Sequence, residues 1–568
     1  MTVSSDLRTM KEPGTGTDSS KVPAGLDAKV EARLRGMSLE DKVGQVFMFG
    51  FPGKDPENAR PLIEDLRAGG IIYFARNTGP VGEVAALSAT LQEIALRSGP
   101  GIPLFISADQ EGGIVCRLTE GFPVMPGHMA LAAAGGPGLV EKVAEAIGTG
   151  LRAAGINMNL APVLDVNDNP DNPVIGIRSF GSSPERVAEL GAAYARGLRE
   201  SGVIPVGKHF PGHGNTSVDS HLNLPVLPHS WDRLERVELF PFRRVISGGL
   251  ECIMSAHVLF EALDPDRPAT LSPKVLVGLL REKIGFSGLI MTDCLEMDAI
   301  SEYYSGTVRG AVEAFKAGAD VLLISHTFEM QKEAYMALCS AVRSGEVPQS
   351  RLDESVSRIL KLKYLFSIPN PLEPEAFPLN NWDEYRNLSA QAHRDSITVV
   401  KDERGVVPLK PGARILLVTP DGAQRLQMED PARPGTTAGT PLGNALRSKG
   451  FVVRERTYST CEIPGAVDEH YMIVVTEGAT RNPAQAAFVG RVRGLSLQSP
   501  APGTVSGSRG QAISVILVAA REPYDISLFP EVGTYICTYG SRPESMEALS
   551  QILAGKCVAR GKLPVELE

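Results

Sequence analysis

The chain has 568 residues, a formal net charge of -9 at pH 7 and a sequence pI near 5.7. This length exceeds one ordinary globular core, so we expect a large domain and a smaller one. The acidic balance provides no basic surface for nucleic acid and no polybasic segment for an anionic membrane, and no run of about 18 apolar residues predicts a membrane span. We therefore expect a neutral small-molecule substrate, with no nucleic-acid and no membrane partner.

The first residues are polar and rich in Ser, Thr and Gly, without the apolar centre of a signal peptide. They predict a disordered leader over residues 1–25 and a cytoplasmic protein. The seven cysteines stand singly, without a Cys-x-x-Cys spacing, so neither a disulfide framework nor a zinc site is predicted. No cofactor is expected.

Short apolar runs typical of strands alternate with amphipathic helical stretches over residues 26–365. Eight such runs begin at Val43, Gly69, Ile102, Ile156, Ile204, Glu251, Gly288 and Ala319. Eight repeats of a strand and a helix predict a (β/α)8 barrel of the TIM type. In such a barrel the functional site lies at the carboxyl ends of the strands.

Ionisable residues stand at the predicted carboxyl ends of five of these strands. They are Asp109 on the third strand, Asp165 after the fourth, Lys208 and His209 on the fifth, His257 on the sixth and Asp293 on the seventh. We interpret this convergence as a site at the mouth of the barrel.

Prolines crowd the stretch that starts at Phe366, which predicts a surface linker over residues 366–394. Six strand-like runs and a helix ended by Gly555 follow, and they predict a smaller α/β sandwich domain over residues 395–568. The segment from Gly494 to Gln511 is typical of a flexible loop. We assign no catalytic residue to this second domain.

The sequence GKHFPGHGNTSVDSHLNLP, from Gly207, is the richest in chemistry. Asp219 and His221 stand two residues apart, so in an extended segment the carboxylate can hold one ring nitrogen and leave the other free to move a proton. A purely structural Asp-His contact is an equally open interpretation. The three histidines also allow a metal site, although no further cluster of ligands supports it.

Asp293 follows four apolar residues and Thr292, which places a carboxylate at the barrel mouth. It could act as a nucleophile, or it could cap the helix that follows. Glu296 and Asp298 are assigned to the first turn of that helix, where acidic residues suit the helix dipole.

Three other residues could hold the hydroxyl groups of a ligand. Asp109 and Arg117 flank a Gly-Gly turn, and a salt bridge that only locks this turn is the alternative. Arg178 follows a loop dense in Asn, Asp and Pro, and either binds substrate or braces that loop.

Together these motifs resemble family 3 of the glycoside hydrolases, and more narrowly its β-N-acetylglucosaminidase branch. The branch pattern K-H-[FI]-P-G-H-G-[DN]-T-x-x-D-S-H is matched from Lys208 to His221 without a departure. Further patterns match in order: D-x-E-G-G-x-V-x-R from Asp109, I-G-x-R-S-F-G from Ile175, T-D-x-L-x-M-x-A-I from Thr292 and A-G-x-D-x-L-L-I from Ala317. The resemblance covers the whole barrel and, more loosely, the second domain.

The resemblance implies a retaining, exo-acting enzyme that removes terminal non-reducing N-acetylglucosamine through a covalent glycosyl enzyme. It implies Asp293 as the nucleophile and Asp219 with His221 as the acid/base pair. It implies sugar contacts from Asp109, Arg117, Arg178, Lys208 and His209. Chitin fragments, peptidoglycan turnover products and glycoconjugates all stay open as substrates.

Four alternatives remain at this point. An uncharged histidine base repels anions less than a carboxylate does, so phosphate could replace water and give phosphorolysis. A β-glucosidase, or a mixed β-N-acetylglucosaminidase/β-glucosidase, on the same fold is a close alternative. A non-catalytic sugar-binding protein and a metal-dependent hydrolase are more distant ones.

Overall fold

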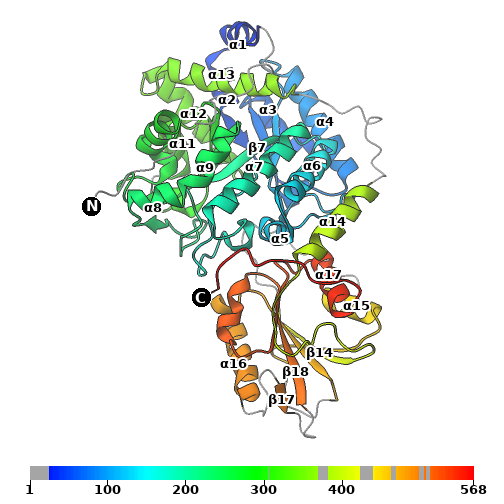
Figure 1. Ribbon diagram of the computed structural model, residues 1–568. Coiled ribbons are helices and arrows are strands. Elements are labelled where there is room, and N and C mark those ends of the chain that lie inside the picture. Colours follow the sequence, from blue (N-terminus) through cyan, green and yellow to red (C-terminus); the bar gives the residue numbers. More distant parts are fainter. Residues whose placement is uncertain are drawn as a thin grey trace, which may run out of the picture.

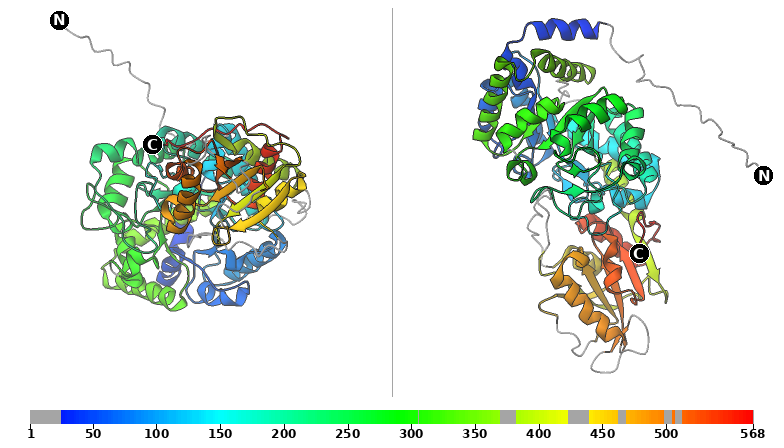
Figure 2. Two further views of the ribbon diagram at one scale, coloured as in Figure 1. Left: turned by 90° about the horizontal axis from the view of Figure 1, so that it is seen from below. Right: turned by 90° about the vertical axis from the view of Figure 1, so that its left-hand side faces the viewer.

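The computed structural model describes residues 25–304, 306–368, 382–422, 439–461, 468–497, 504–506 and 512–567. Residues 1–24 of the predicted leader and residues 369–381 of the predicted linker lie outside the described residues. The described chain forms a barrel domain and a smaller second domain, which lies beside one end of the barrel domain (Figures 1 and 2).

Eight parallel strands close into a barrel in the order β1-β12-β11-β9-β7-β6-β3-β2. Their bounds are β1 (Phe47–Phe49), β2 (Gly70–Tyr73), β3 (Phe105–Ala108), β6 (Met158–Asn159), β7 (Ile204–Phe210), β9 (Cys252–Ser255), β11 (Leu289–Cys294) and β12 (Val321–Ile324). The predicted (β/α)8 barrel is confirmed. The strands are shorter than the apolar runs that predicted them, because several of those runs extend into the adjoining loops.

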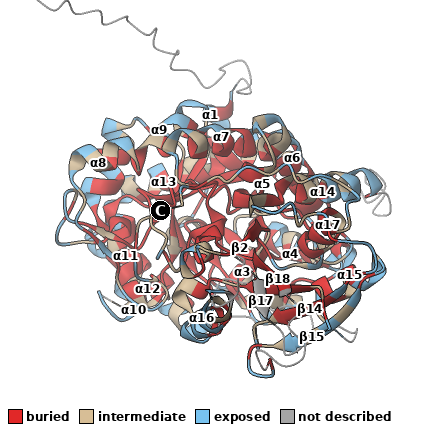
Figure 3. Ribbon diagram, turned by 60° about the horizontal axis from the view of Figure 1, so that its bottom comes forward, coloured by how far each residue is buried: buried red, intermediate tan, exposed pale blue. Residues whose placement is uncertain are grey.

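Helices surround the strands (Figure 2). They are α1 (Leu26–Arg35), α2 (Leu39–Gln45), α3 (Arg60–Glu64), α4 (Val81–Arg97), α5 (His128–Ala134), α6 (Pro137–Ala153), α7 (Pro184–Glu200), α8 (Trp231–Arg236), α9 (Leu239–Ser247), the π-helix Lys274–Lys283, α10 (Asp298–Ser301), α11 (Thr307–Ala317), α12 (Phe328–Ser344) and α13 (Gln349–Leu365). The strands are buried and exposed residues gather on outer helices such as α8 (Figure 3).

Short strands and 3-10 helices occupy the loops of the barrel. β4 (Gln110–Gly112) pairs with β5 (Val115–Cys116), and β8 (Val226–Leu227) pairs with β10 (Leu259–Phe260). The 3-10 helices of this domain are Pro56–Asn58, Ala75–Asn77, Gly176–Arg178 and Ala269–Leu271.

The first predicted strand begins too early in the sequence. Its residues Val43 to Gln45 belong to helix α2, which Ser38 starts by accepting a hydrogen bond from the backbone N–H of Asp41, while Asp41 accepts one from the N–H of Ser38. This capping box starts a helix, although the apolar residues that follow are typical of a strand.

Small residues let the helices approach one another closely, as the sequence indicates. A Cβ atom on Gly197 of α7 would stand 2.2 Å from the carbonyl oxygen of Glu141 in α6. A Cβ on Gly148 of α6 would stand 1.8 Å from the Ser201 hydroxyl. Larger residues at these two positions would therefore force the two helices apart.

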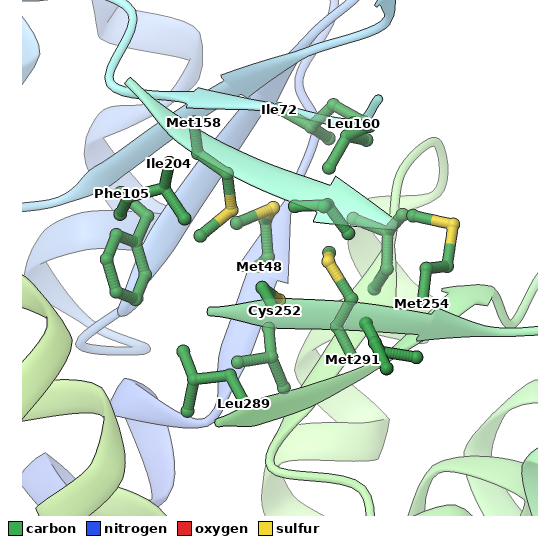
Figure 4. Packing of buried hydrophobic residues seen from close by; sticks show 14 of the residues in the cluster. Met48, Ile72, Phe105, Met158, Leu160, Ile204, Cys252, Met254, Leu289 and Met291 are labelled. Carbon is green, nitrogen blue, oxygen red and sulfur yellow. The ribbon is translucent and has the colours of Figure 1, made fainter. Parts of the chain in front are cut away.

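The inside of the barrel is filled by side chains rather than by a channel (Figure 4). Met48, Met158, Met254 and Met291 come from four different strands and are at most 2% exposed. Methionine is flexible enough to fill an irregular interior of this kind. A ligand is consequently confined to the mouth of the barrel.

The second domain is built on a mixed sheet in the order β13-β19-β18-β16-β14-β15, with β17 beside β18. Its strands are β13 (Thr398–Asp402), β14 (Arg414–Thr419), β15 (Val452–Thr457), β16 (Tyr471–Thr476), β17 (Thr504–Ser506), β18 (Ala512–Ala519) and β19 (Thr534–Cys537). Its helices are α15 (Pro441–Ser448), α16 (Pro483–Leu497), α17 (Pro543–Leu553) and the 3-10 helices Ala479–Arg481 and Pro523–Leu528. Helices α15 and α17 pack together on one face of this sheet, so the predicted α/β sandwich is confirmed.

Two predicted irregular segments contain regular structure. Helix α14 (Asp383–Ser396) starts within the range 366–394 expected to be a linker and ends just beyond it, and its residue Ala392 and its N-cap residue Trp382 pack in the hydrophobic cluster of the barrel. The loop expected from Gly494 begins as the end of α16 and includes β17, whose backbone pairs antiparallel with β18. Residues 498–503 and 507–511 of that loop lie outside the described residues. No helix in the described parts of the chain is long and apolar enough to cross a membrane.

A buried carboxylate joins the elements at the amino-terminal end of the barrel. Asp320, which is fully buried just before β12, accepts hydrogen bonds from the backbone N–H of Ile290 (3.0 Å) and from the Ser355 hydroxyl (2.7 Å). It also faces the guanidinium groups of Arg281, Arg351 and Arg358. This carboxylate ties β11 and α13 to the floor of the barrel.

We expect Asp320→Ala to lower the free energy of unfolding by about 3 kcal/mol, because it leaves partly buried arginines without their anion. Denaturant unfolding followed by circular dichroism measures this change. Asp383→Ala is the control, since the side chain of Asp383 is 77% exposed and its removal should cost less than about 0.5 kcal/mol. Equal losses in the two variants would contradict the prediction.

Candidate active site

A cavity of about 590 Å³ opens at the carboxyl ends of the barrel strands. Seven of the eight predicted site residues line it: Asp109, Arg117, Arg178, Lys208, His209, His221 and Asp293. The eighth, Asp219, lies directly behind His221. The structure thus brings together residues that are spread over 185 positions of the sequence (from 109 to 293, inclusive).

One wall of the cavity is a network of buried charges. The Lys208 ammonium lies 2.8 Å from Asp109 and 2.7 Å from Glu111. Arg178 donates two hydrogen bonds to the carboxylate of Glu111, at 2.9 and 2.7 Å, and Arg117 lies 3.4 Å from Asp109. Three cations therefore share two carboxylates, which leaves a net positive charge on this wall.

These pairings keep all the groups charged although they are buried. Burial by itself would raise the pKa of Glu111, but Arg178 and Lys208 hold that pKa well below 4.5. Burial would lower the pKa of Lys208, but Asp109 and Glu111 raise it above 10.5. The wall is therefore a fixed array of donors and acceptors suited to the hydroxyl groups of a sugar.

His209 is oriented by a buried carboxylate, Asp165. One carboxylate oxygen of Asp165 lies 2.7 Å from Nδ1 of His209, and the other accepts the backbone N–H groups of His209 (3.2 Å) and His213 (2.7 Å). Burial opposes the charge on Asp165, but His209 lowers its pKa overall, so the carboxylate is an acceptor and Nδ1 of His209 is the donor. Nε2 of His209 is then left for the cavity.

Asp293 lies within β11 at the cavity floor. Burial alone would raise its pKa, but His209, His257 and His221 lower it, so the carboxylate is ionised at neutral pH. One oxygen accepts the backbone N–H of Cys294 at 2.7 Å. His257 lies behind it, with Nε2 donating to the carbonyl oxygen of Cys294 at 3.0 Å. The hydrogen bond from His257 thus fixes the backbone next to Asp293.

Asp219 and His221 form the expected pair. Nδ1 of His221 lies 2.7 Å from a carboxylate oxygen of Asp219, which also accepts the backbone N–H of His221 at 2.9 Å. Burial opposes the charge on Asp219, but the hydrogen bond from His221 lowers its pKa. Because Asp219 is an acceptor, Nε2 of His221 is the ring nitrogen left to exchange a proton.

His213, the third histidine of this segment, is structural. Its Nδ1 lies 2.8 Å from the Thr216 hydroxyl and its Nε2 lies 2.9 Å from the Ser220 hydroxyl. Burial lowers its pKa to about 4, so it is neutral at physiological pH. Within the described residues, no group of three or more His, Cys, Asp or Glu side chains is placed to hold a metal ion.

Comparison with known proteins shows the family to which the chain belongs. Residues 38–362 match the model of the glycosyl hydrolase family 3 N-terminal domain. The chain belongs to glycosyl hydrolase family 3. It is similar to β-hexosaminidase A of Pseudoalteromonas piscicida, with 31% identity over 560 residues, 90% of this chain and 91% of that protein.

Two other proteins are similar over nearly the whole chain. The β-N-acetylglucosaminidase/β-glucosidase of Cellulomonas fimi is 28% identical, with 97% of this chain and 98% of that protein covered. The structure of a family 3 β-N-acetylglucosaminidase from Paenibacillus sp. str. FPU-7 is 41% identical, with a TM-score of 0.84 over 94% of this chain and 99% of that one. Both domains are therefore shared with enzymes of the family.

Sequence reasoning missed one carboxylate of this family 3 site, gave a second no role and misplaced a third. Glu111 was not predicted as a site residue, although it stands within the D-x-E-G-G motif, and Asp165 was predicted at the barrel mouth without a role. Glu296 was assigned to a first helical turn, but α10 starts only at Asp298. Glu296 instead accepts the backbone N–H groups of Ser325, His326 and Thr327 and lines the cavity. The N-cap of α10 is Met297, so Asp293 is not a helix cap.

We expect Glu111→Gln to destabilise the protein by about 3–5 kcal/mol at pH 7, because Lys208 and Arg178 lose a buried anion. The folded-state pKa of Glu111 is lowered, so its contribution is fully present above the unfolded value near 4.5 and is lost as the pH falls through the folded value. The difference in unfolding free energy between wild type and variant should therefore be constant above about pH 5 and shrink below it.

Urea unfolding at several pH values measures this difference. Glu235→Gln is the matched control, since the side chain of Glu235 is 40% exposed and its loss should be small at every pH. A difference that grows as the pH falls would show that the sign of the argument is wrong.

Proposed function

We propose that this family 3 enzyme is a retaining, exo-acting β-N-acetylglucosaminidase. The observation that carries the proposal is that one cavity holds an ionised carboxylate, Asp293, and an imidazole, His221, whose other nitrogen is fixed by Asp219. These are the two functions that a retaining glycosidase needs, a nucleophile and an acid/base. The amino sugar is supported by the names of the similar enzymes and by the Asp-Ser-His motif.

In the first step, Asp293 attacks the anomeric carbon of the terminal sugar. Nε2 of His221 gives its proton to the departing oxygen, and Asp219 stabilises the imidazolium before that transfer. The bond from the anomeric carbon to the leaving oxygen breaks as the bond to the Asp293 carboxylate forms.

In the second step, the neutral His221 takes a proton from water as the water attacks the glycosyl ester of Asp293. Two displacements at one carbon return the original configuration. The wall formed by Asp109, Lys208 and Arg178, whose two cations are held by the buried Glu111, holds the sugar hydroxyls during both steps. The cytoplasmic location indicated by the polar first residues stays a prediction.

We expect Asp293→Asn to lower kcat/KM for an aryl β-N-acetylglucosaminide by about 10³-fold or more, since it removes the nucleophile. His221→Ala should lower it by about 10²–10⁴-fold for a poor leaving group. Release of the phenol measures both rates, and proton NMR of the first product should show the β-anomer. Addition of phosphate distinguishes hydrolysis from formation of a sugar 1-phosphate.

Asp232→Asn is the control for these variants, because Asp232 is an exposed residue on α8 away from the cavity. Its rate should equal that of the wild type. The proposal fails if Asp293→Asn keeps the wild-type rate, or if the first product is the α-anomer. An aryl β-glucoside cleaved as fast as the amino sugar would instead support the mixed specificity.

A further inference from the structure

A loop of the barrel lies between the second domain and the segment that carries Asp219 and His221. This bridging loop, residues 167–176, follows β6. The segment on its other side, residues 213–221, is the acid/base loop. Two exposed apolar side chains, Val218 within this loop and Leu222 just beyond it, are 40% and 56% exposed. Three polar side chains of this loop, His213, Thr216 and Ser220, are buried, but none of its side chains belongs to a hydrophobic cluster of the described residues, so hydrogen bonds from its neighbours fix its position.

The bridging loop supplies those hydrogen bonds through two asparagines. The side-chain amide of Asn172 donates to the carbonyl oxygens of His213 (2.9 Å) and Gly214 (3.0 Å). The amide of Asn169 donates to the carbonyl oxygen of Asn215 (3.2 Å) and lies 3.1 Å from the Ser217 hydroxyl. The acid/base loop is thus attached to the bridging loop along much of its length.

The second domain holds the bridging loop in turn. Arg481, at the end of the 3-10 helix Ala479–Arg481, donates to the carbonyl oxygens of Asn172 (2.7 Å) and Pro170 (3.3 Å). Its other terminal nitrogen lies 2.8 Å from the carboxylate of Glu522, whose side chain is 4% exposed. The hydroxyl of Tyr524 accepts a hydrogen bond from the Asn167 amide at 3.1 Å.

Arg481 can fix the position of the bridging loop because its guanidinium is itself held by Glu522. Glu522 stays charged: burial opposes its ionisation, but Arg521 and Arg481 lower its pKa. A planar guanidinium held by a carboxylate on one side presents its remaining N–H groups in a set direction on the other. Those N–H groups point at the carbonyl oxygen of Asn172.

The last link joins the acid/base loop to the catalytic pair. His213, held through its carbonyl by Asn172, bonds to the Ser220 hydroxyl at 2.9 Å. Ser220 stands between Asp219 and His221 in the sequence. A continuous series of contacts therefore runs from Arg481 through Asn172 and His213 to the acid/base pair.

We propose that Arg481 of the second domain is a positioning residue, which holds the acid/base loop where Nε2 of His221 can reach the leaving oxygen. The inference rests on the proposed function, because it needs His221 to be the acid. It gives the second domain a role in proton transfer without placing any of its residues in contact with the substrate. Among the hydrogen bonds between the described residues of the two domains, the contact of Arg481 with Asn172 is the one that leads on to the acid/base loop.

The leaving group provides the test, because protonation matters most for a poor one. We expect Arg481→Ala to lower kcat/KM about tenfold for an aryl β-N-acetylglucosaminide with a poorly acidic phenol, a part of the 10²–10⁴-fold that a general acid contributes. For a dinitrophenyl leaving group, which departs without a proton, the loss should stay within about twofold. kcat/KM reports the step in which the phenol leaves. The ratio of kcat/KM for the dinitrophenyl substrate to kcat/KM for the substrate with the poorly acidic phenol therefore rises when acid catalysis is lost.

This ratio does not depend on how much of the variant is folded and active, because both rates scale alike with active enzyme. Arg493→Ala is the matched control: it removes an arginine whose partner, Glu531 at 2.8 Å, belongs to the same domain. Its ratio should equal that of the wild type. Arg481→Lys keeps a cation beside Glu522 and one donor for Asn172, so its ratio should fall between those of wild type and Arg481→Ala. His221→Ala removes the proposed acid altogether, so its ratio should be the highest of all the variants.

A ratio for Arg481→Ala that rises at least about fivefold above the wild-type value, with Arg493→Ala unchanged, supports the inference. An unchanged ratio overturns it, whether both rates fall together or neither does. If the ratio is unchanged in Arg481→Ala but raised in His221→Ala, the proposed function stands and only the role of Arg481 is wrong. If the wild type cleaves neither substrate, the proposed function fails and the inference fails with it.

Discussion

A carboxylate removed from water must be matched by cations or by hydrogen-bond donors, and this constraint organises both ends of the barrel. At the mouth, Glu111 is 1% exposed and shares its two oxygens between Arg178 and Lys208. Because Arg178 comes from the loop after β6 and Lys208 from β7, one carboxylate fixes two strand ends and one loop at once. The charged wall of the cavity is therefore a structural element before it is a binding surface.

Asp165 and Asp320 meet the same constraint in different ways. Asp165 is satisfied by an imidazole and by two backbone N–H groups, so it sets both the orientation of His209 and the path of the chain to His213. Asp320 is satisfied mainly by arginines and serves the barrel floor. A carboxylate at the mouth directs rings and cations toward a ligand, whereas one at the floor only joins the elements around it.

The barrel could be predicted from the sequence because a strand that is buried on both faces appears as an apolar run. Eight such runs, alternating with helices, allow few other folds. The sequence also sufficed to predict that Asp109, Lys208 and Asp293 meet in one cavity, since strand ends of a barrel converge whatever the loops do. The sequence could not predict those site residues whose role depends on a partner distant in the sequence. Glu111 lies 67 positions from Arg178, and no local pattern predicts that pairing.

The same limit explains Glu296 and α14. The position of Glu296 suited a first helical turn, but the three N–H groups of the loop after β12 offered its carboxylate better partners than a helix dipole does. Helix α14 follows a stretch rich in proline in the sequence, yet it forms because its apolar face packs on the barrel surface. In both cases a tertiary contact outweighed a correct local preference.

Placing the acid/base pair on a loop has a physical consequence for the whole molecule. A strand end such as that of Asp293 inherits its position from the packed barrel, whereas no side chain of residues 213–221 belongs to a hydrophobic cluster of the described residues, and hydrogen bonds connect this loop to its neighbours. Such a loop needs support from its neighbours to keep a fixed position. The bridging loop gives that support, and its far side is covered by Arg481 and Tyr524 of the second domain. We infer that the proposed nucleophile depends on the barrel alone, while the position of the proposed acid depends on how the two domains pack.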